Sequence, residues 1–222
     1  VQEPELNQRR VAPTSIWHIF SALKPPYLST TWRVAMMVSG AQGGSYALTI
    51  WLPTYLKTVR GISSVGTGSY LLVLILGAFF GFISGAYLAD GIGRKPTFIL
   101  SAVASVVLTI VYLFAPISND WILLVGFLLG YVSLIMFSPM GSYMTELYPT
   151  AVRGTGQGFC YNAGRGLGAL FPAFVGFLAA RLGLGMAIAI FSLAAYGVMI
   201  VALFLLPETR GRSLESLEQP AS

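Results

Sequence analysis

The sequence has very few of the residues from which catalytic, metal and disulfide sites are usually built. Of its 222 residues only 9% are charged, and it holds one cysteine, Cys160, and one histidine, His18. A single cysteine excludes an intrachain disulfide and a cysteine-rich metal site. No nucleophile–base pair, metal cluster or phosphate-binding loop is recognisable, so we expect no catalytic residue, metal or other cofactor. Nor is any basic cluster interleaved with aromatic residues, which argues against a nucleic-acid partner.

Long apolar runs take up most of the chain instead. Hydrophobic residues make up 55% of it, whereas roughly 25% of an ordinary soluble domain is charged. Six segments each approach the ~20 residues that cross a bilayer as a helix. They are Thr30–Leu56, Thr67–Ala89, Pro96–Ala115, Trp121–Thr145, Thr155–Ala180 and Gly185–Leu206. We predict an all-α polytopic membrane protein with a bundle of six transmembrane helices, and the alternative is a large soluble helical bundle.

The predicted domain boundaries follow from these segments. Residues 1–29 are expected to form a cytoplasmic linker with a short amphipathic piece at Ile16–Leu23, residues 30–206 the transmembrane domain, and residues 207–222 a cytoplasmic tail. Lysine and arginine accumulate on the cytoplasmic side of membrane proteins. With both termini inside, the cytoplasmic segments hold Arg9, Arg10, Lys24, Arg33, Arg94, Lys95, Arg153, Arg210 and Arg212, against Lys57, Arg60 and Arg181 outside. Both termini are therefore predicted to be cytoplasmic.

Arg165 is a lone, permanently charged side chain about halfway along an apolar segment. If its helix begins near Arg153, a rise of ~1.5 Å per residue places it ~15–18 Å into a hydrocarbon core ~30 Å thick. A guanidinium cannot lose its proton there, so it must face water, a charged partner or an anionic ligand. We interpret Arg165 as a substrate-binding residue. The alternative is an ion pair with an acid from a part of the protein outside this chain.

Helical spacing indicates which other polar side chains could line the same site as Arg165. Tyr161 and Asn162 lie one turn before Arg165 on the same helix face. Gln42 and Tyr46 lie on a polar stripe of the first segment, together with Ser45 and Thr49. Ser138 lies on a similar stripe of the fourth segment, where Pro139 is expected to bend the helix. The alternative for the last two stripes is hydrogen bonding between helices.

Acids and bases meet at three junctions predicted to lie on the cytoplasmic side. The candidate residues of this charge network are Asp90, Arg94, Glu146, Arg153, Glu208 and Arg210. We expect them to pair across helices and to hold that end of the bundle closed. Helix capping and topological signalling are the alternative, at a few tenths to ~1 kcal/mol each.

These motifs resemble those of the major facilitator superfamily. The loop Gly85–Lys95 is similar to the family's glycine–aspartate–glycine–arginine signature, with Gly91 where the family often has a basic residue. The segments Glu146–Gly154 and Pro207–Gly211 resemble motifs of the sugar-porter branch. The resemblance implies the carboxy-terminal six-helix half of a twelve-helix transporter, whose partner is an amino-terminal half. Sugar porters usually carry a glutamine pair on the first helix of this half, but here only Gln42 is present. The chain is more similar to metabolite–proton symporters.

We therefore expect half of a secondary active transporter in a cell membrane, either a bacterial inner membrane or a plasma membrane. Its substrate would be a small organic anion, a carboxylate metabolite, carried by proton symport with alternating access. No acid of the sequence lies in the middle of an apolar segment, so the carboxylate that titrates would belong to the other half or to the substrate. One alternative is a sugar or polyol transporter, and the other is a receptor or scaffold that does not transport.

Overall fold

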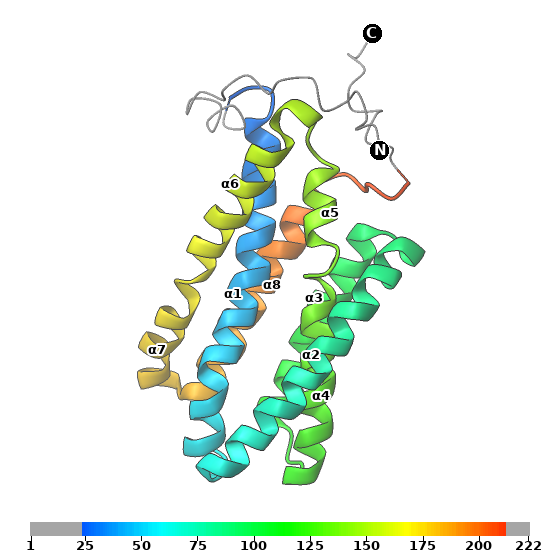
Figure 1. The fold of residues 1–222 in the computed structure, drawn as a ribbon. Coiled ribbons are helices and arrows are strands. Elements are labelled where there is room, and N and C mark those ends of the chain that lie inside the picture. Colours follow the sequence, from blue (N-terminus) through cyan, green and yellow to red (C-terminus); the bar gives the residue numbers. More distant parts are fainter. Residues whose placement is uncertain (1–23, 212–222) are drawn as a thin grey trace, which may run out of the picture.

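The computed structural model describes residues 24–211, and these form eight helices and no strand. The amphipathic piece expected at Ile16–Leu23 lies outside the described residues. The helices are α1 (Leu28–Thr58), α2 (Ser64–Ile92), α3 (Arg94–Phe114), α4 (Asn119–Ile135), α5 (Met140–Thr145), α6 (Thr150–Gly168), α7 (Phe171–Leu182) and α8 (Leu184–Phe204). Figure 1 shows them as a bundle of roughly aligned helices, with α8 behind α1 and α3 behind α2. The predicted all-α polytopic fold is confirmed.

Two of the six predicted segments are interrupted helices. The fourth consists of α4 and α5, which are separated at Met136–Pro139, as the position of Pro139 predicted. The fifth consists of α6 and α7, separated at Ala169–Leu170, and this break was not predicted. Pro172 explains it, since a proline has no N–H for the carbonyl four residues earlier and its ring clashes with that carbonyl. The Trp51 indole of α1 donates to the Pro172 carbonyl at 2.8 Å and so ties α7 to α1.

Five helical stretches are long and apolar enough to span a membrane by length and composition, namely Ser64–Ile92, Arg94–Phe114, Asn119–Thr145, Thr150–Leu182 and Leu184–Phe204. The 31-residue α1 is not among them. It is long enough, but its middle carries the polar and small residues of the stripe around Gln42, most of which are buried against α6 and α8. The polar middle of α1 is thus largely covered by neighbouring helices.

Small residues determine how closely the helices pack. α2 lies along α4, and α1 lies between α6 and α8 (Figure 1). A Cβ atom at Gly77 or Gly81 of α2 would overlap the backbone carbonyl of Phe127 or Tyr131 of α4. The spacing of four residues between these glycines predicted such a close approach, and the structure confirms it.

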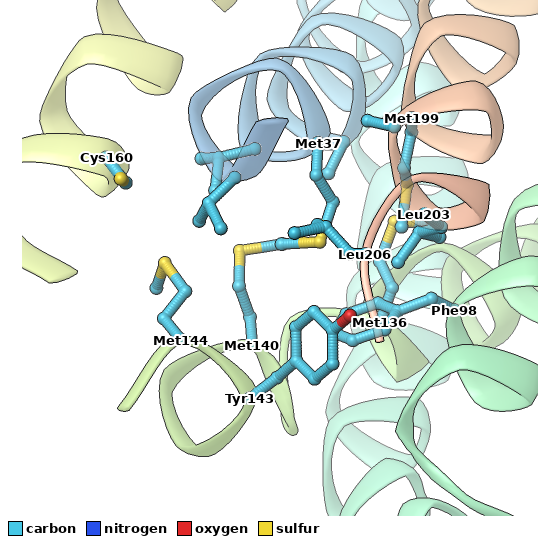
Figure 2. Close-up of a cluster of buried hydrophobic side chains, with 14 of the residues drawn as sticks. Met37, Phe98, Met136, Met140, Tyr143, Met144, Cys160, Met199, Leu203 and Leu206 are labelled. Carbon is cyan, nitrogen blue, oxygen red and sulfur yellow. The ribbon is translucent and has the colours of Figure 1, made fainter. Parts of the chain in front are cut away.

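A methionine-rich core fills the end of the bundle where α1 begins and α8 ends. Figure 2 shows side chains from α1, the α4–α5 region and α8 converging there, with Phe98 and Tyr143 in edge contact at a centroid distance of 5.3 Å. The buried methionines are Met37, Met136, Met140, Met144 and Met199. Methionine is unbranched and adapts to irregular gaps, so this core can repack at low cost when helices shift.

The glycine contact between α2 and α4 yields a stability prediction. Gly81→Ala should lower the midpoint of thermal unfolding in detergent, because the added methyl group forces the two backbones apart, at a cost of about 1–3 kcal/mol. Gly68→Ala is the matched control, since it lies on the same helix and a Cβ there meets nothing within 4 Å. Equal midpoints for the two variants would contradict the close packing of α2 on α4.

Candidate functional site

A hollow of about 350 Å³ opens between α1, α4 and α6. It is lined by Gln42, Ser45, Tyr46, Thr49, Leu134, Phe137, Tyr161 and Arg165. Four of the six residues that the sequence suggested for substrate binding therefore border one space, although they come from two helices that are far apart in sequence. They are Gln42, Tyr46, Tyr161 and Arg165. We call this space the central hollow.

Arg165 lies near the middle of the 33-residue stretch Thr150–Leu182. The helix begins at Thr150, a few residues earlier than expected, so Arg165 lies about 22 Å along the axis at ~1.5 Å per residue. Its side chain is exposed, and within residues 24–211 its guanidinium makes no hydrogen bond or ion pair. The approach of α6 to α1 beside it depends on Gly164, where a Cβ would press on Val38. The backbone is thus held rigidly while the charged group stays available.

The other polar groups of the hollow come from α1 and α6. Gln42 is 5% exposed, and Tyr46 and Tyr161 are half-buried. Thr49 turns its hydroxyl back to the Ser45 carbonyl at 2.7 Å. The hollow therefore combines one cation with an amide, two phenols and the apolar side chains of Leu134 and Phe137.

Ser138 and Asn162 lie elsewhere. Ser138 borders a different space of about 220 Å³, which Asp90 and Arg94 also line. The chain changes direction at Met136–Pro139, so the spacing counted along α4 no longer holds at Ser138. Asn162 is exposed, and its amide donates to the Gly158 carbonyl of its own helix at 2.8 Å. Neither side chain lines the central hollow of this chain.

The charged junctions meet at the end of the bundle that holds the methionine-rich core. Arg94 pairs with Asp90 at 2.5 Å and with Glu146 at 3.2 Å, which links α2, α3 and the end of α5. The other oxygen of Glu146 accepts the Thr209 hydroxyl at 2.5 Å. The Glu208 carboxylate accepts the backbone N–H groups of Arg94 at 3.0 Å and of Lys95 at 2.9 Å. The segment after α8 is thereby fastened to the start of α3.

The Glu208 carboxylate is held in its charged form. Burial alone would raise its pKa, but backbone N–H groups of Arg210, Lys95, Arg94 and Thr209 donate to it, and its pKa is lowered overall. Hydrogen bonds that favour the ionised form act in this direction. The anion also lies over the first turn of α3, where the positive end of the helix dipole favours it.

The two remaining candidates of the network take different positions. The Arg153 Nε donates to the carbonyls of Thr145 at 3.2 Å and Tyr148 at 3.3 Å. The Arg210 side chain is exposed, and its backbone N–H reaches Glu208. Among residues 24–211 the ion pairs involve Asp90, Arg94 and Glu146.

Sequence reasoning missed several residues of these sites. Leu134 and Phe137 border the central hollow, but the sequence is so apolar that nothing distinguishes them from lipid-facing residues. Thr209 completes the charge network through Glu146. Its position between Glu208 and Arg210 was a signal for it, because a hydroxyl between two candidate network residues is placed to join them.

Comparison with known proteins identifies the family. Residues 4–220 match the family model described as sugar (and other) transporter. A probable 4-methylmuconolactone transporter of Cupriavidus pinatubonensis is 36% identical over 213 residues, which cover 95% of this chain and 48% of that protein. A cis,cis-muconate transport protein of Acinetobacter baylyi is 32% identical over 173 residues, which cover 77% of this chain and 41% of that protein.

A third relative is the niacin transporter NiaP of Acinetobacter baylyi, which is 28% identical over 219 residues, covering 98% of this chain and 48% of that protein. The chain spans about half the length of these relatives or somewhat less. Together with the apolar helices, the matches show a multi-pass membrane protein. The chain belongs to the sugar (and other) transporter family of the major facilitator superfamily, a family of transport proteins rather than enzymes.

Proposed function

We propose that this chain is the carboxy-terminal half of a secondary active transporter and that its central hollow binds a small organic carboxylate. The observation that carries the proposal is the position of Arg165. It is a permanent cation in the middle of a membrane-spanning stretch, it is exposed in the hollow, and it makes no ion pair within residues 24–211. Placing such a charge at the centre of a bilayer costs about 2.5–3.5 kcal/mol on insertion scales, and a bound anion would offset that cost.

The chemistry of the hollow suits a carboxylate. A guanidinium offers two parallel hydrogen bonds to a planar carboxylate, which add both strength and orientation. The acids of the described residues are Asp90, Asp120, Glu146 and Glu208, and each lies at or beyond a helix end rather than beside the hollow. Within this part of the chain, no side chain can serve as the counter-anion of Arg165. A substrate is the simplest source of the negative charge.

The names of the relatives support the same substrate class. Muconate is a dicarboxylate, and niacin is an aromatic carboxylic acid. The half-buried Tyr46 and Tyr161, with Phe137, provide aromatic surface for an unsaturated or ring-shaped body beside the carboxylate. Aromatic contacts of this kind add about 0.5–1.5 kcal/mol per pair beyond burial.

We propose that the other wall of the hollow belongs to an amino-terminal half of the same carrier, because the chain spans about half of its relatives. Carriers of this architecture bind substrate near the bilayer midplane between two repeats and rock around it. Proton symport is part of the proposal. The carboxylate that titrates would lie in the other half or on the substrate, and an uncoupler that collapses the pH gradient should stop accumulation.

We further propose that both termini are cytoplasmic and that the network around Arg94 acts as a latch on that side. The pairs join helices from three parts of the chain, so opening that end would separate them. Exposed pairs contribute only ~0–1 kcal/mol. Here Arg94 is largely buried and bonds with two acids at once, so the network can bias the balance between two states of the carrier.

A sugar or polyol is the second candidate substrate. The hollow has Gln42 and hydroxyl groups on Thr49 and the two tyrosines, and these groups can bond to substrate hydroxyls. A binding assay with the complete protein separates the two substrate classes. In it, a neutral hexose and benzoate are each tested for displacement of the same bound ligand. If the hexose displaces a bound ligand and benzoate does not, the carboxylate proposal fails.

Replacing Arg165 tests the proposal most simply. Arg165→Lys keeps the charge but loses the two-pronged geometry, so affinity for the carboxylate should fall by about 1–3 kcal/mol, roughly 5–150-fold. Arg165→Gln should abolish uptake while the protein still reaches the membrane. Both effects are measured as uptake of a labelled carboxylate into vesicles that carry the complete protein.

Arg181→Gln is the matched control for Arg165→Gln. It removes the same charge near the end of α7, where the guanidinium lies over the Phe177 ring at 5.8 Å from its centroid. Its uptake should stay near that of the unmodified protein. Normal transport by Arg165→Lys would contradict two-pronged recognition.

The latch yields a separate kinetic prediction. In the complete carrier, Asp90→Asn should slow substrate exchange more than it weakens equilibrium binding, because Arg94 loses one of its two partners while the central hollow keeps its residues. Asp120→Asn makes the same chemical change at the first turn of α4 and should leave exchange unaltered. If Asp90→Asn exchanges at the unmodified rate, the network has no role in switching.

A further inference from the structure

A second, much smaller cavity lies directly behind the wall of the central hollow. Its volume is about 20 Å³, and it lies between α1, α2 and α4. Both spaces are lined by Ser45, Thr49 and Leu134, whereas Ser133 lines the small cavity but not the central hollow. A space of ≳10–15 Å³ holds one water molecule when polar groups surround it. The cavity has the size and the hydroxyl groups for one water.

Unpartnered hydroxyl groups gather beside this cavity. Tyr196 of α8 is completely buried, and its hydroxyl lies near Ser45, Ser105 and Ser133, although not in hydrogen-bond geometry. Within residues 24–211 the Ser45 and Tyr196 hydroxyl oxygens are buried and have no hydrogen-bond partner. Ser105 and Ser133 make only a long contact of 3.4 Å. Thr109 and Ser192, one turn away on α3 and α8, also have buried unpartnered hydroxyls.

The backbone of α1 leaves room for the Tyr196 phenol beside this cavity. A Cβ at Gly44 of α1 would overlap the Tyr196 ring, so only glycine leaves room for the ring against α1. A phenylalanine would fill the same space without adding an unsatisfied hydroxyl. Buried polar groups in proteins nearly always have a partner, which is either another protein group or an ordered water.

We propose that the small cavity binds one ordered water, which bridges Ser45 and Ser133 and connects them to the Tyr196 hydroxyl. Water fits better than a metal cation, because the lining groups are serine and threonine hydroxyls and apolar side chains, with no carboxylate to balance a charge. The water joins α1 to α4 immediately behind the residues that line the central hollow. It thus supports the polar wall of the substrate site from inside this half.

The test is X-ray radiolysis of the complete protein in ¹⁸O-labelled water, followed by mass spectrometry. Hydroxyl radicals formed from a bound water label the side chains next to it. Leu129 lines the cavity and is 0% exposed, so it should take up label. Leu203 is also 0% exposed but packs in the methionine-rich core, and it should remain unlabelled. If Leu129 labels no faster than Leu203, the proposal is overturned.

Two further measurements identify the ligand as water. Ser133→Val, which fills the cavity with methyl groups, should remove the label from Leu129. Tyr196→Phe should lower the midpoint of thermal unfolding if its hydroxyl bonds to the water, whereas loss of an unpartnered hydroxyl would leave it unchanged or raise it. Replacement of sodium in the buffer by choline should alter neither result, and a sodium-dependent loss of label or stability would contradict a water site.

Discussion

An uncompensated charge or an unpaired polar group is costly inside a bilayer, and the arrangement of this chain follows from that constraint. Within residues 24–211 the charged side chains other than Arg165 lie at or near helix ends, and several of them pair with one another or with carbonyl groups. Arg60 illustrates this, since its guanidinium donates to the carbonyls of Tyr112, Ala115 and Ile117 at the end of α3. Arg165 is the exception in position, and it opens onto the central hollow. This exception is the basis of the substrate-binding proposal for Arg165.

Helix packing determines where Arg165 lies. Glycines bring α2 against α4 and α6 against α1, so the backbone around the hollow is held by close contacts rather than by long side chains. The two spans interrupted at Met136–Pro139 and Ala169–Leu170 both contribute residues to the lining of the hollow. Broken helices are characteristic of transporter binding sites at membrane depth. The methionine-rich core beneath the charge network provides a packing that can adjust when that end opens.

Much of this organisation could be predicted because hydropathy and helical spacing are local properties of a sequence. The apolar segments follow from the length of the hydrophobic runs, the break at Pro139 from the chemistry of proline, and the shared face of Tyr161 and Arg165 from a period of 3.6 residues. The convergence of α1 with α6 did not follow from spacing, since it depends on which helices are neighbours. Ser138 illustrates the limit, because a break in the helix changed the direction of everything after it. Thr209 and the cavity behind Ser45 depend on contacts between distant segments.

The most direct measurement is the distance between the Arg165 guanidinium and the carboxylate of a bound substrate. Solid-state NMR can measure it in the complete protein in lipid, with ¹⁵N in the arginine side chains, ¹³C in the carboxyl group of benzoate, and Arg165→Lys to assign the signal. The account predicts strong ¹⁵N–¹³C dipolar coupling that corresponds to direct hydrogen bonding and disappears in the variant. A bound benzoate whose carboxyl carbon shows no coupling to Arg165 would contradict it.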